Sequence, residues 1–379
     1  IGVIMSDMLC MLPTHTVKSR VQILAEKCDY NHRMMNIPKM WNRTRGAGIK
    51  VAVLDTGCPQ HVDLAPCGSM TAFPGYEHDT NGHSTHCGGI IAAIANNDMG
   101  VAGIAPDVDD YYGAVLNASG NGDIESIIKG IRWAVDDIGA DVISMSLGIA
   151  AGELHFSKFE KACNYAVSQG VAVFAAAGNE SGAVGQPAIY DSVIAVAAVN
   201  NRKDHAYFSN TGPEVDFAAG GVNVYSTYLD NSYAELSGTS MACPAAAAVG
   251  ALILAGSANV GIKLSPDELR AKLRKIAYDV GPDGFDELYG HGIPIFGSGG
   301  APYDPPEEPA AGKPGPKWGI RSDCATWRVA RNVISDMVDK LDNGTHIDNV
   351  LETGIRRLSR EFGVVDSALR AQEATDEAI

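Results

Sequence analysis

The sequence predicts an α/β fold in which helices cover both faces of a mostly parallel sheet. Between residues 49 and 199, short runs rich in β-branched residues alternate with longer stretches of helical periodicity. Strands that alternate with helices form parallel sheets, which are buried on both sides. The uncharged stretch 236–255 points the same way, because small and apolar residues on every face predict a helix inside a large core.

The elements follow one another in the order that such a sheet requires. The run 49–54 predicts a strand that ends at Asp55-Thr56-Gly57, and isoleucines at helical spacing give the stretch 123–138 an apolar face. Functional groups of parallel sheets gather at the carboxyl ends of the strands, where Asp55, Ser146 and Asn179 stand. The remaining expected strands are 111–116, 142–146, 171–176 and 193–199, and the remaining helices lie near 84–95 and 158–169.

The stretch 236–255 also places a serine at the start of a helix. Gly238-Thr239-Ser240 predicts a tight turn, and we expect the helix from Met241 onward with Pro244 in its first turn. Free N–H groups and the helix dipole favour developing negative charge at this position. Ser240 is therefore a candidate nucleophile, although serine is also a favoured helix cap.

Composition excludes several classes of function. The 379 residues, 46% of them hydrophobic, suffice for one large globular domain and a smaller unit. The net charge of −16 argues against a nucleic-acid partner. No apolar run approaches the length of a membrane span, and the first residues lack a basic leader, so we expect no membrane association. The eight cysteines show no regular spacing, which favours reduced thiols and a cytoplasmic location.

Changes in composition divide the chain into four segments. Residues 1–40 form an N-terminal extension, and residues 41–297 carry the α/β pattern. Residues 298–319 are rich in Gly and Pro, which is typical of a linker. Residues 320–379 predict a C-terminal helical hairpin whose apolar stripes need a partner surface. Three partner surfaces stay open: the main domain, a second copy of the chain in a homo-oligomer, and another protein.

Three residues with the chemistry of an activated serine stand in turn-rich contexts. They are Asp55 in VAVLDTG, His83 in NGHSTHCGG and Ser240 in SGTSMACP. A serine hydroxyl is a poor nucleophile until an imidazole takes its proton and a carboxylate holds that imidazole in the right tautomer. The order Asp, His, Ser is one known order of this triad. His83, His86 and Cys87 also suggest a metal pair, but a third ligand motif at suitable spacing is missing.

With these motifs the chain resembles the subtilisin family of serine peptidases over about residues 41–296. The resemblance is closest to the intracellular branch of that family, because of the stretch MMNIPKMWNRTRGAGIKVAVLDTGC. The resemblance implies that family's three-layer α/β/α fold and a serine endopeptidase acting on proteins or peptides. It assigns Asp55 to orienting the imidazole, His83 to acid–base catalysis and Ser240 to attack on the carbonyl. Asn179 in AAAGNES matches the family's oxyanion-hole asparagine.

The resemblance also implies a cleft that binds peptide as an added strand. Its two edges match Gly120-Asn121-Gly122 and Ser146-Leu147-Gly148. The primary pocket is assigned to small, uncharged residues, so we expect a large apolar side chain just before the cut. These residues are Ala176, Ala177, Gly178 and Gly185.

A structural calcium ion is implied by the stretch 95–101, which resembles the family's calcium loop. The expected ligands are the side chains of Asp63 and Asn97 and the main-chain carbonyls of Ala95, Met99 and Val101. Mixed carboxylate, amide and carbonyl oxygens suit Ca²⁺.

The N-terminal extension resembles the short inhibitory segment of intracellular members, with Leu12 and Pro13 as the expected block. The chain would then be made as a self-inhibited precursor. Two positions depart from the family pattern: Ser84 follows the catalytic histidine where Gly is usual, and Ala245 follows Pro244 where His is usual. Two alternatives therefore stay open, a processing peptidase with one partner substrate and a catalytically weak peptide-binding or assembly protein.

Overall fold

The computed structural model describes residues 9–12, 16–21 and 26–297. The chain divides into residues 1–306 and 307–379, and every described residue belongs to the first unit. The expected linker and the C-terminal helical hairpin lie outside the described residues, as does Pro13.

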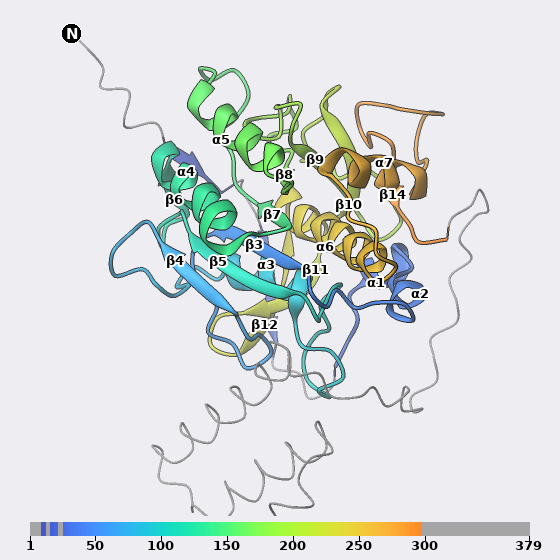
Figure 1. Cartoon of the computed structure of the whole chain (residues 1–379), viewed down its shortest axis with the longest axis horizontal. Coiled ribbons are helices and arrows are strands. Elements are labelled where there is room, and N and C mark those ends of the chain that lie inside the picture. The colour runs from blue at the N-terminus through green and yellow to red at the C-terminus, as the bar shows by residue number, and fades with distance from the viewer. Residues whose placement is uncertain (1–8, 13–15, 22–25, 298–379) are drawn as a thin grey trace, which may run out of the picture. The chain divides into compact units, whose positions relative to one another are not determined.

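A seven-stranded sheet with the order β10-β9-β8-β7-β3-β5-β4 forms the centre of the first unit (Figure 1). All its neighbouring strands pair in parallel, which confirms the expected fold class. β7, β8, β9 and β10 are buried along their whole length, as strands covered on both faces must be. The strands are β3 (Lys50–Asp55), β4 (Gly68–Thr71), β5 (Asp109–Ala114), β7 (Val142–Met145), β8 (Ala172–Ala176), β9 (Ile194–Val199) and β10 (Val215–Gly220).

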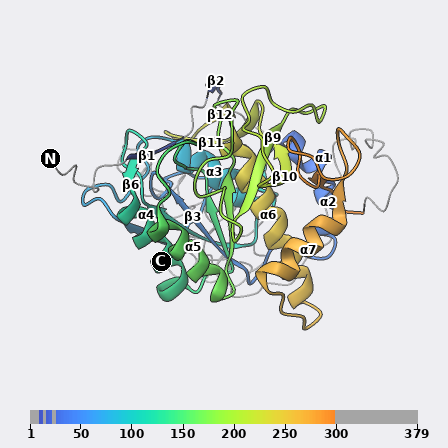
Figure 2. The ribbon, with the colours of Figure 1, turned by 90° about the horizontal axis from the view of Figure 1, so that it is seen from above.

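Helices pack on the two sides of this sheet. Figure 2 shows α4 and α5 on one side and α6 and α7 on the other. α4 (Ile124–Arg132) continues into a π-helical turn, η1 (Trp133–Ile138). The other helices are α1 (Tyr30–Met34), α2 (Ile37–Trp41), α3 (His83–Ala92), α5 (Ser157–Ser168), α6 (Thr239–Ala258) and α7 (Pro266–Ile276).

Among the described residues, seven short strands lie outside the central sheet. β11 (Val224–Tyr228) and β12 (Ser232–Ser237) form a hairpin, and β2 (Thr16–Val21) pairs with β12. β1 (Leu9–Met11) pairs with β6 (Asn121–Asp123), and β13 (Ala277–Tyr278) pairs with β14 (Ile293–Pro294). The pairing of β1 matters most, because it brings the N-terminal extension onto one of the expected substrate edges.

Helix α6 corrects two expectations. It begins at Thr239, earlier than expected, so Pro244 lies inside the helix and not in its first turn. Its 20 residues are also long and apolar enough to cross a membrane, whereas we expected no apolar run of that length. Because 78% of that apolar window is buried in the protein, α6 is a core helix.

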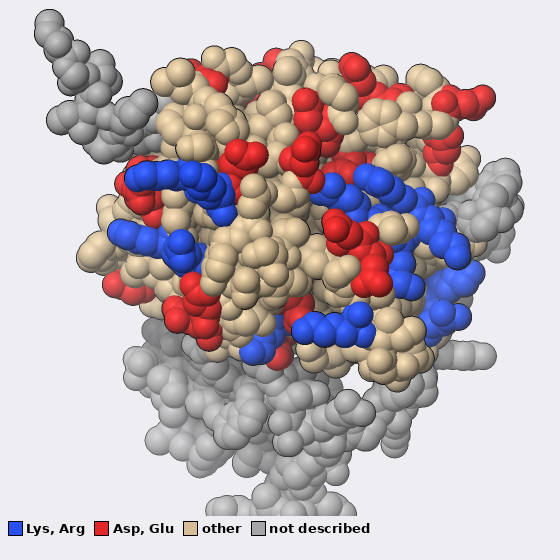
Figure 3. All heavy atoms as spheres, turned by 45° about the horizontal axis from the view of Figure 1, so that its top comes forward, with Lys and Arg blue, Asp and Glu red and all other residues tan. Residues whose placement is uncertain are grey.

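Surface charge is mixed where it can be seen. Figure 3 shows Lys and Arg side chains interspersed with Asp and Glu side chains over one face. The net charge of −16 is therefore not gathered into one acidic patch on that face.

Gly89 lets α3 lie close against β11. A Cβ at Gly89 would clash with Thr227 Oγ1 and Ser226 Oγ. These hydroxyls donate to the carbonyls of Thr85 and His86, at 2.7 and 2.8 Å, and so cannot move without losing a hydrogen bond. The position of the helix that carries His83 therefore depends on a glycine.

We expect Gly89→Ala to lower the free energy of unfolding by up to about 2 kcal/mol, because overpacking costs about 1–3 kcal/mol and the gain in helix propensity offsets about 1 kcal/mol of it. Urea unfolding in a Ser240→Ala background measures this without self-digestion. Gly256→Ala in α6 is the matched control, since its Cβ would meet the flexible end of Met40. Equal effects of the two substitutions would contradict the close approach at Gly89.

Candidate active site

Asp55 and His83 form a buried pair at the carboxyl end of β3. Both side chains are fully buried, and His83 Nδ1 lies 2.8 and 2.9 Å from the two carboxylate oxygens of Asp55. Gly82 adopts a left-handed φ of 97°, which allows α3 to begin directly at His83. The contact places Nδ1 against the carboxylate and turns Nε2 away from it.

The electrostatics of the pair favour a charged imidazole. Burial lowers the pKa of His83, but the charges of Asp55 and Cys87 and their hydrogen bonds to the ring together raise it by more. The net pKa lies well above the ordinary value of 6.5. His83 can therefore hold a proton that it has taken from a neighbour.

The carboxylate of Asp79 joins the turn after β3 to the first turn of α3. It accepts hydrogen bonds from Thr56 Oγ1 at 2.8 Å, from Gly82 N at 3.0 Å and from Thr85 N at 2.8 Å. Ser84, one of the departures from the family pattern, adds a bond of 2.6 Å from its hydroxyl to the carbonyl of Gly57. Sequence reasoning missed Asp79, because it lies three residues before the N-cap Gly82 and not at the capping position itself.

Ser240 lies fully buried in the first turn of α6, and its hydroxyl donates to the carbonyl of Ser146 at 3.4 Å. Pro244 has no N–H, so the carbonyl of Ser240 four residues earlier loses its helical donor. That oxygen accepts instead from Ser146 Oγ at 2.8 Å and from Cys87 Sγ at 3.4 Å. Cys87 Sγ also lies 3.8 Å from His83 Nδ1, so the helices that carry His83 and Ser240 meet at this sulfur.

Asn179 is held in one orientation by the residue before the serine. Its Oδ1 accepts from Thr239 N at 2.9 Å and from Thr239 Oγ1 at 2.7 Å. Since the oxygen end of the amide is bound there, the Nδ2 end is directed away from Thr239. Sequence reasoning did not assign this role to Thr239, although the residue belongs to the serine motif.

His86 does not form a metal pair with His83. Its Nε2 lies 3.1 Å from the carbonyls of both Val224 and Ala234, which fixes the ring against the β11–β12 hairpin. Six described cysteines are free, but Cys67 is disulfide-bonded, so the expectation of wholly reduced thiols is wrong at that position. The free cysteines are Cys10, Cys28, Cys58, Cys87, Cys163 and Cys243.

The two expected substrate edges enclose the N-terminal extension. β1 pairs antiparallel with β6, and Leu12 N donates to the carbonyl of Gly120 at 3.0 Å. On the other side, Met11 and Gly148 exchange two backbone hydrogen bonds of 3.2 Å. Cys10 is fully buried between the edges and donates to the carbonyl of Gly148 at 3.1 Å, whereas Met11 is 54% exposed. Residues 9–12 thus lie as an added strand in the cleft.

The four residues expected in the primary pocket line one cavity of about 60 Å³. The expectation that this pocket carries no charge is wrong, because Glu180 also lines it. The Glu180 carboxylate accepts from Asn179 N at 3.0 Å and from Asn210 Nδ2 at 2.7 Å. Asn210 comes from a distant loop, and no local sequence pattern signals that contact.

Of the expected calcium ligands, the structure places the side chains of Asp63 and Asn97 in contact. The buried carboxylate of Asp63 accepts from Asn97 Nδ2, from Val101 N at 3.1 Å and from Tyr233 OH at 3.2 Å. Glu26, which sequence reasoning missed, brings a second carboxylate to the loop by accepting from Asn97 N at 3.0 Å. Burial raises the pKa of Asp63 to about 8, so its charged form is costly without a cation.

Comparison with known proteins supports the same interpretation. The model of the subtilase family matches residues 46–292. Subtilisin DY of Bacillus licheniformis is 43% identical over 257 residues, which cover 66% of this chain and 89% of that protein. Thermostable alkaline protease of Halalkalibacterium halodurans is 42% identical over 65% of this chain and 66% of its own. Subtilisin Savinase of Lederbergia lenta is 39% identical over 71% of this chain and 97% of its own.

These matches do not separate the branches of the family, so membership in the intracellular branch stays a prediction. The matched region contains Asp55, His83, Asn179 and Ser240. The chain belongs to the subtilase family and is a subtilisin-like serine endopeptidase.

Proposed function

We propose that Asp55, His83 and Ser240 hydrolyse peptide bonds through an acyl-enzyme. The observation that carries this proposal is the buried contact of 2.8 Å between His83 and Asp55, with Cys87 Sγ linking His83 to the main chain of Ser240 at the start of α6. The hydrogen bond of Ser84 to Gly57 supports it too, since this departure from the family pattern ties the site together. It speaks against the alternative of a catalytically weak binding protein.

Each residue has a role that its environment suits. His83 Nε2 takes the proton of Ser240 as Oγ attacks the substrate carbonyl, and Asp55 stabilises the resulting imidazolium. Asn179 Nδ2 and the N–H of Ser240 bind the oxyanion that forms. His83 then gives its proton to the leaving amine, and water hydrolyses the acyl-enzyme through the same base.

We assign the N-terminal extension an inhibitory role in a precursor. Residues 9–12 use the backbone groups of Gly120, Gly122 and Gly148 that a substrate strand would need. Glu180 adds a carboxylate to the primary pocket. We therefore expect the pocket to accept basic as well as large apolar side chains at the substrate residue just before the cut.

A calcium ion fits the loop around Asp63. Two carboxylates, an amide and the carbonyls of Ala95, Met99 and Val101 give oxygen donors of the kind that Ca²⁺ takes. Such an ion supplies positive charge that offsets the burial of Asp63, and it ties the segment at Glu26 to the loop.

We expect Cys10→Arg to raise peptidase activity of the full chain at least tenfold, because a charged side chain does not fit where Cys10 is fully buried. Met11→Arg is the matched control, since that side chain is 54% exposed and leaves the strand in place. Hydrolysis of a chromogenic peptide measures both variants. If the two variants equal the wild type, residues 9–12 do not inhibit.

In the Cys10→Arg chain, we expect labelling of Ser240 by a fluorophosphonate to slow as the pH falls through the raised pKa of His83, because only the neutral imidazole accepts the proton. Asp55→Asn removes the charge that raises this pKa, so the midpoint should move to lower pH and the limiting rate should drop by roughly 10⁴-fold. An unchanged midpoint would show that Asp55 does not act on His83.

We expect excess chelator to lower the melting temperature of the Ser240→Ala chain by about 5–10 °C, the shift for an ion present at about 100 times its Kd. The difference in melting temperature with and without chelator should grow as the pH rises through about 8. The reason is that the raised pKa of Asp63 makes the stability of the ion-free protein fall there. Asp63→Asn should abolish the response, and Asp98→Asn, on an exposed loop position, should keep it. A response in Asp63→Asn equal to that of the parent would place the ion elsewhere.

A further inference from the structure

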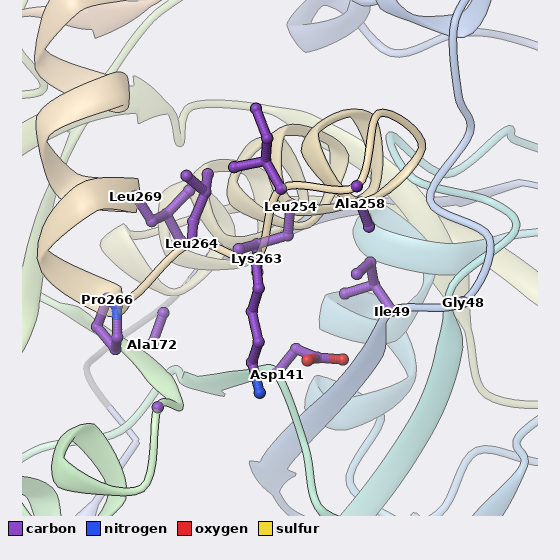
Figure 4. A pocket seen from close by; sticks show the side chains of 13 residues that line it. Gly48, Ile49, Asp141, Ala172, Leu254, Ala258, Lys263, Leu264, Pro266 and Leu269 are labelled. Atoms are coloured by element: carbon purple, nitrogen blue, oxygen red, sulfur yellow. The ribbon is translucent and has the colours of Figure 1, made fainter.

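A cavity of about 340 Å³ lies at the end of α6 that is remote from Ser240 (Figure 4). Leu254 and Ala258 of α6 line it, about 21 Å or more along the helix from Ser240 at 1.5 Å per residue. Ile49, Asp141 and Ala172 line it from the amino ends of β3, β7 and β8. The catalytic groups stand at the opposite, carboxyl ends of the same strands, so this cavity is separate from the active site.

The inner wall of the cavity is apolar and closely packed. Ile49, Leu264 and Leu269 are 6%, 8% and 0% exposed. The volume falls within the range of about 300–1,000 Å³ that small-molecule sites occupy. A large aliphatic or aromatic side chain would therefore find both room and apolar contacts.

One end of the cavity carries a pair of opposite charges. Figure 4 shows the Lys263 side chain crossing the cavity toward Asp141. Asp141 Oδ2 accepts from Lys50 N at 2.9 Å, and the Lys50 ammonium donates to the carbonyl of Ile138, so it does not serve the cavity. Within the described part of the chain, Lys263 forms no ion pair within 4.0 Å.

The rim of the cavity leaves apolar side chains in water. Val260 is 71% exposed and Ile262 is 50% exposed, on the loop that joins α6 to α7. Ile262 also lines the cavity. Exposed apolar side chains around a cavity are typical of a surface that a ligand covers.

We propose that this cavity binds an α-carboxylate together with an α-N–H group and a large apolar side chain. Lys263 takes the carboxylate, Asp141 accepts from the α-nitrogen, and the side chain enters between Ile49, Leu264 and Leu269. A free apolar amino acid and the C-terminal residue of a peptide share this chemistry. A purely apolar ligand would leave both charges unused, and the endopeptidase reaction itself produces peptides with new α-carboxylates. The proposal does not depend on the residue roles proposed for the active site.

The test is calorimetric titration of the full-length Ser240→Ala chain with four probes. L-leucine and N-acetylglycyl-L-leucine carry both groups, leucinamide lacks the carboxylate, and 4-methylpentanoate lacks the nitrogen. We expect roughly millimolar Kd values for ligands of this size that carry both groups, and at least tenfold weaker binding of the other two. Binding of leucine alone would assign the free amino acid, and binding of the peptide would assign a C-terminal residue.

Three variants locate the binding. Lys263→Met should weaken the binding of L-leucine at least tenfold and abolish the preference for leucine over leucinamide. Ala258→Leu should fill the cavity and so weaken binding. Lys161→Met, an exposed lysine of α5, is the matched control and should bind like the parent. The proposal is overturned if neither L-leucine nor N-acetylglycyl-L-leucine binds at about 20 mM. It is also overturned if leucinamide binds as tightly as leucine, or if Lys263→Met and Ala258→Leu leave binding unchanged.

Discussion

The geometry around Ser240 depends on a hydrogen bond that α6 cannot make. Pro244 lacks an N–H, so the carbonyl of Ser240 has no partner within the helix. Ser146 from the end of β7 and Cys87 from α3 supply the missing donors. A carbonyl that must be satisfied inside a core thereby joins the sheet, the helix that carries His83 and the helix that carries Ser240. The small residues of α6, from Ala245 to Ala248, let these elements approach closely.

The same helix explains why the two ends of the sheet differ. A helix apolar on every face belongs in the core, so α6 packs against β7, β8, β9 and β10 and runs from the carboxyl ends of the strands toward their amino ends. At the carboxyl ends of the strands, loops carry Asp55, Ser146 and Asn179 toward its first turn. At the amino ends, the loop that follows α6 leaves a cavity open, and Asp141 and Lys263 line that cavity. The helix dipole favours anionic chemistry at Ser240 and a cation such as Lys263 beyond its last turn.

The sequence predicted what depends on local pattern. A β-rich run identified β3, helical periodicity identified α4, and an uncharged apolar run identified α6. Turn contexts at strand ends identified Asp55, His83, Asn179 and Ser240. Residues that act through distant partners gave no comparable signal: Asp79 serves two segments, and Glu180 is held by Asn210. The turn between β11 and β12 did carry such a signal, because Asp230 and Asn231 are residue types that tolerate the left-handed region, and their φ values are 59° and 53°. Small residues such as those of β10 obscure strands, since they suit a buried helix equally well.

The occupied cleft follows from a general property of sheet edges. A cleft that binds peptide by backbone pairing exposes N–H and C=O groups that any extended strand can satisfy. The chain's own residues 9–12 compete for these groups at an effective concentration that, for a tethered segment, reaches the millimolar range. The segment can therefore hold the cleft with few side-chain contacts, and of its residues Cys10 is buried while Met11 stays in solvent. Under the proposed inhibitory role, cleavage of the tether would remove this effective concentration and so release the cleft.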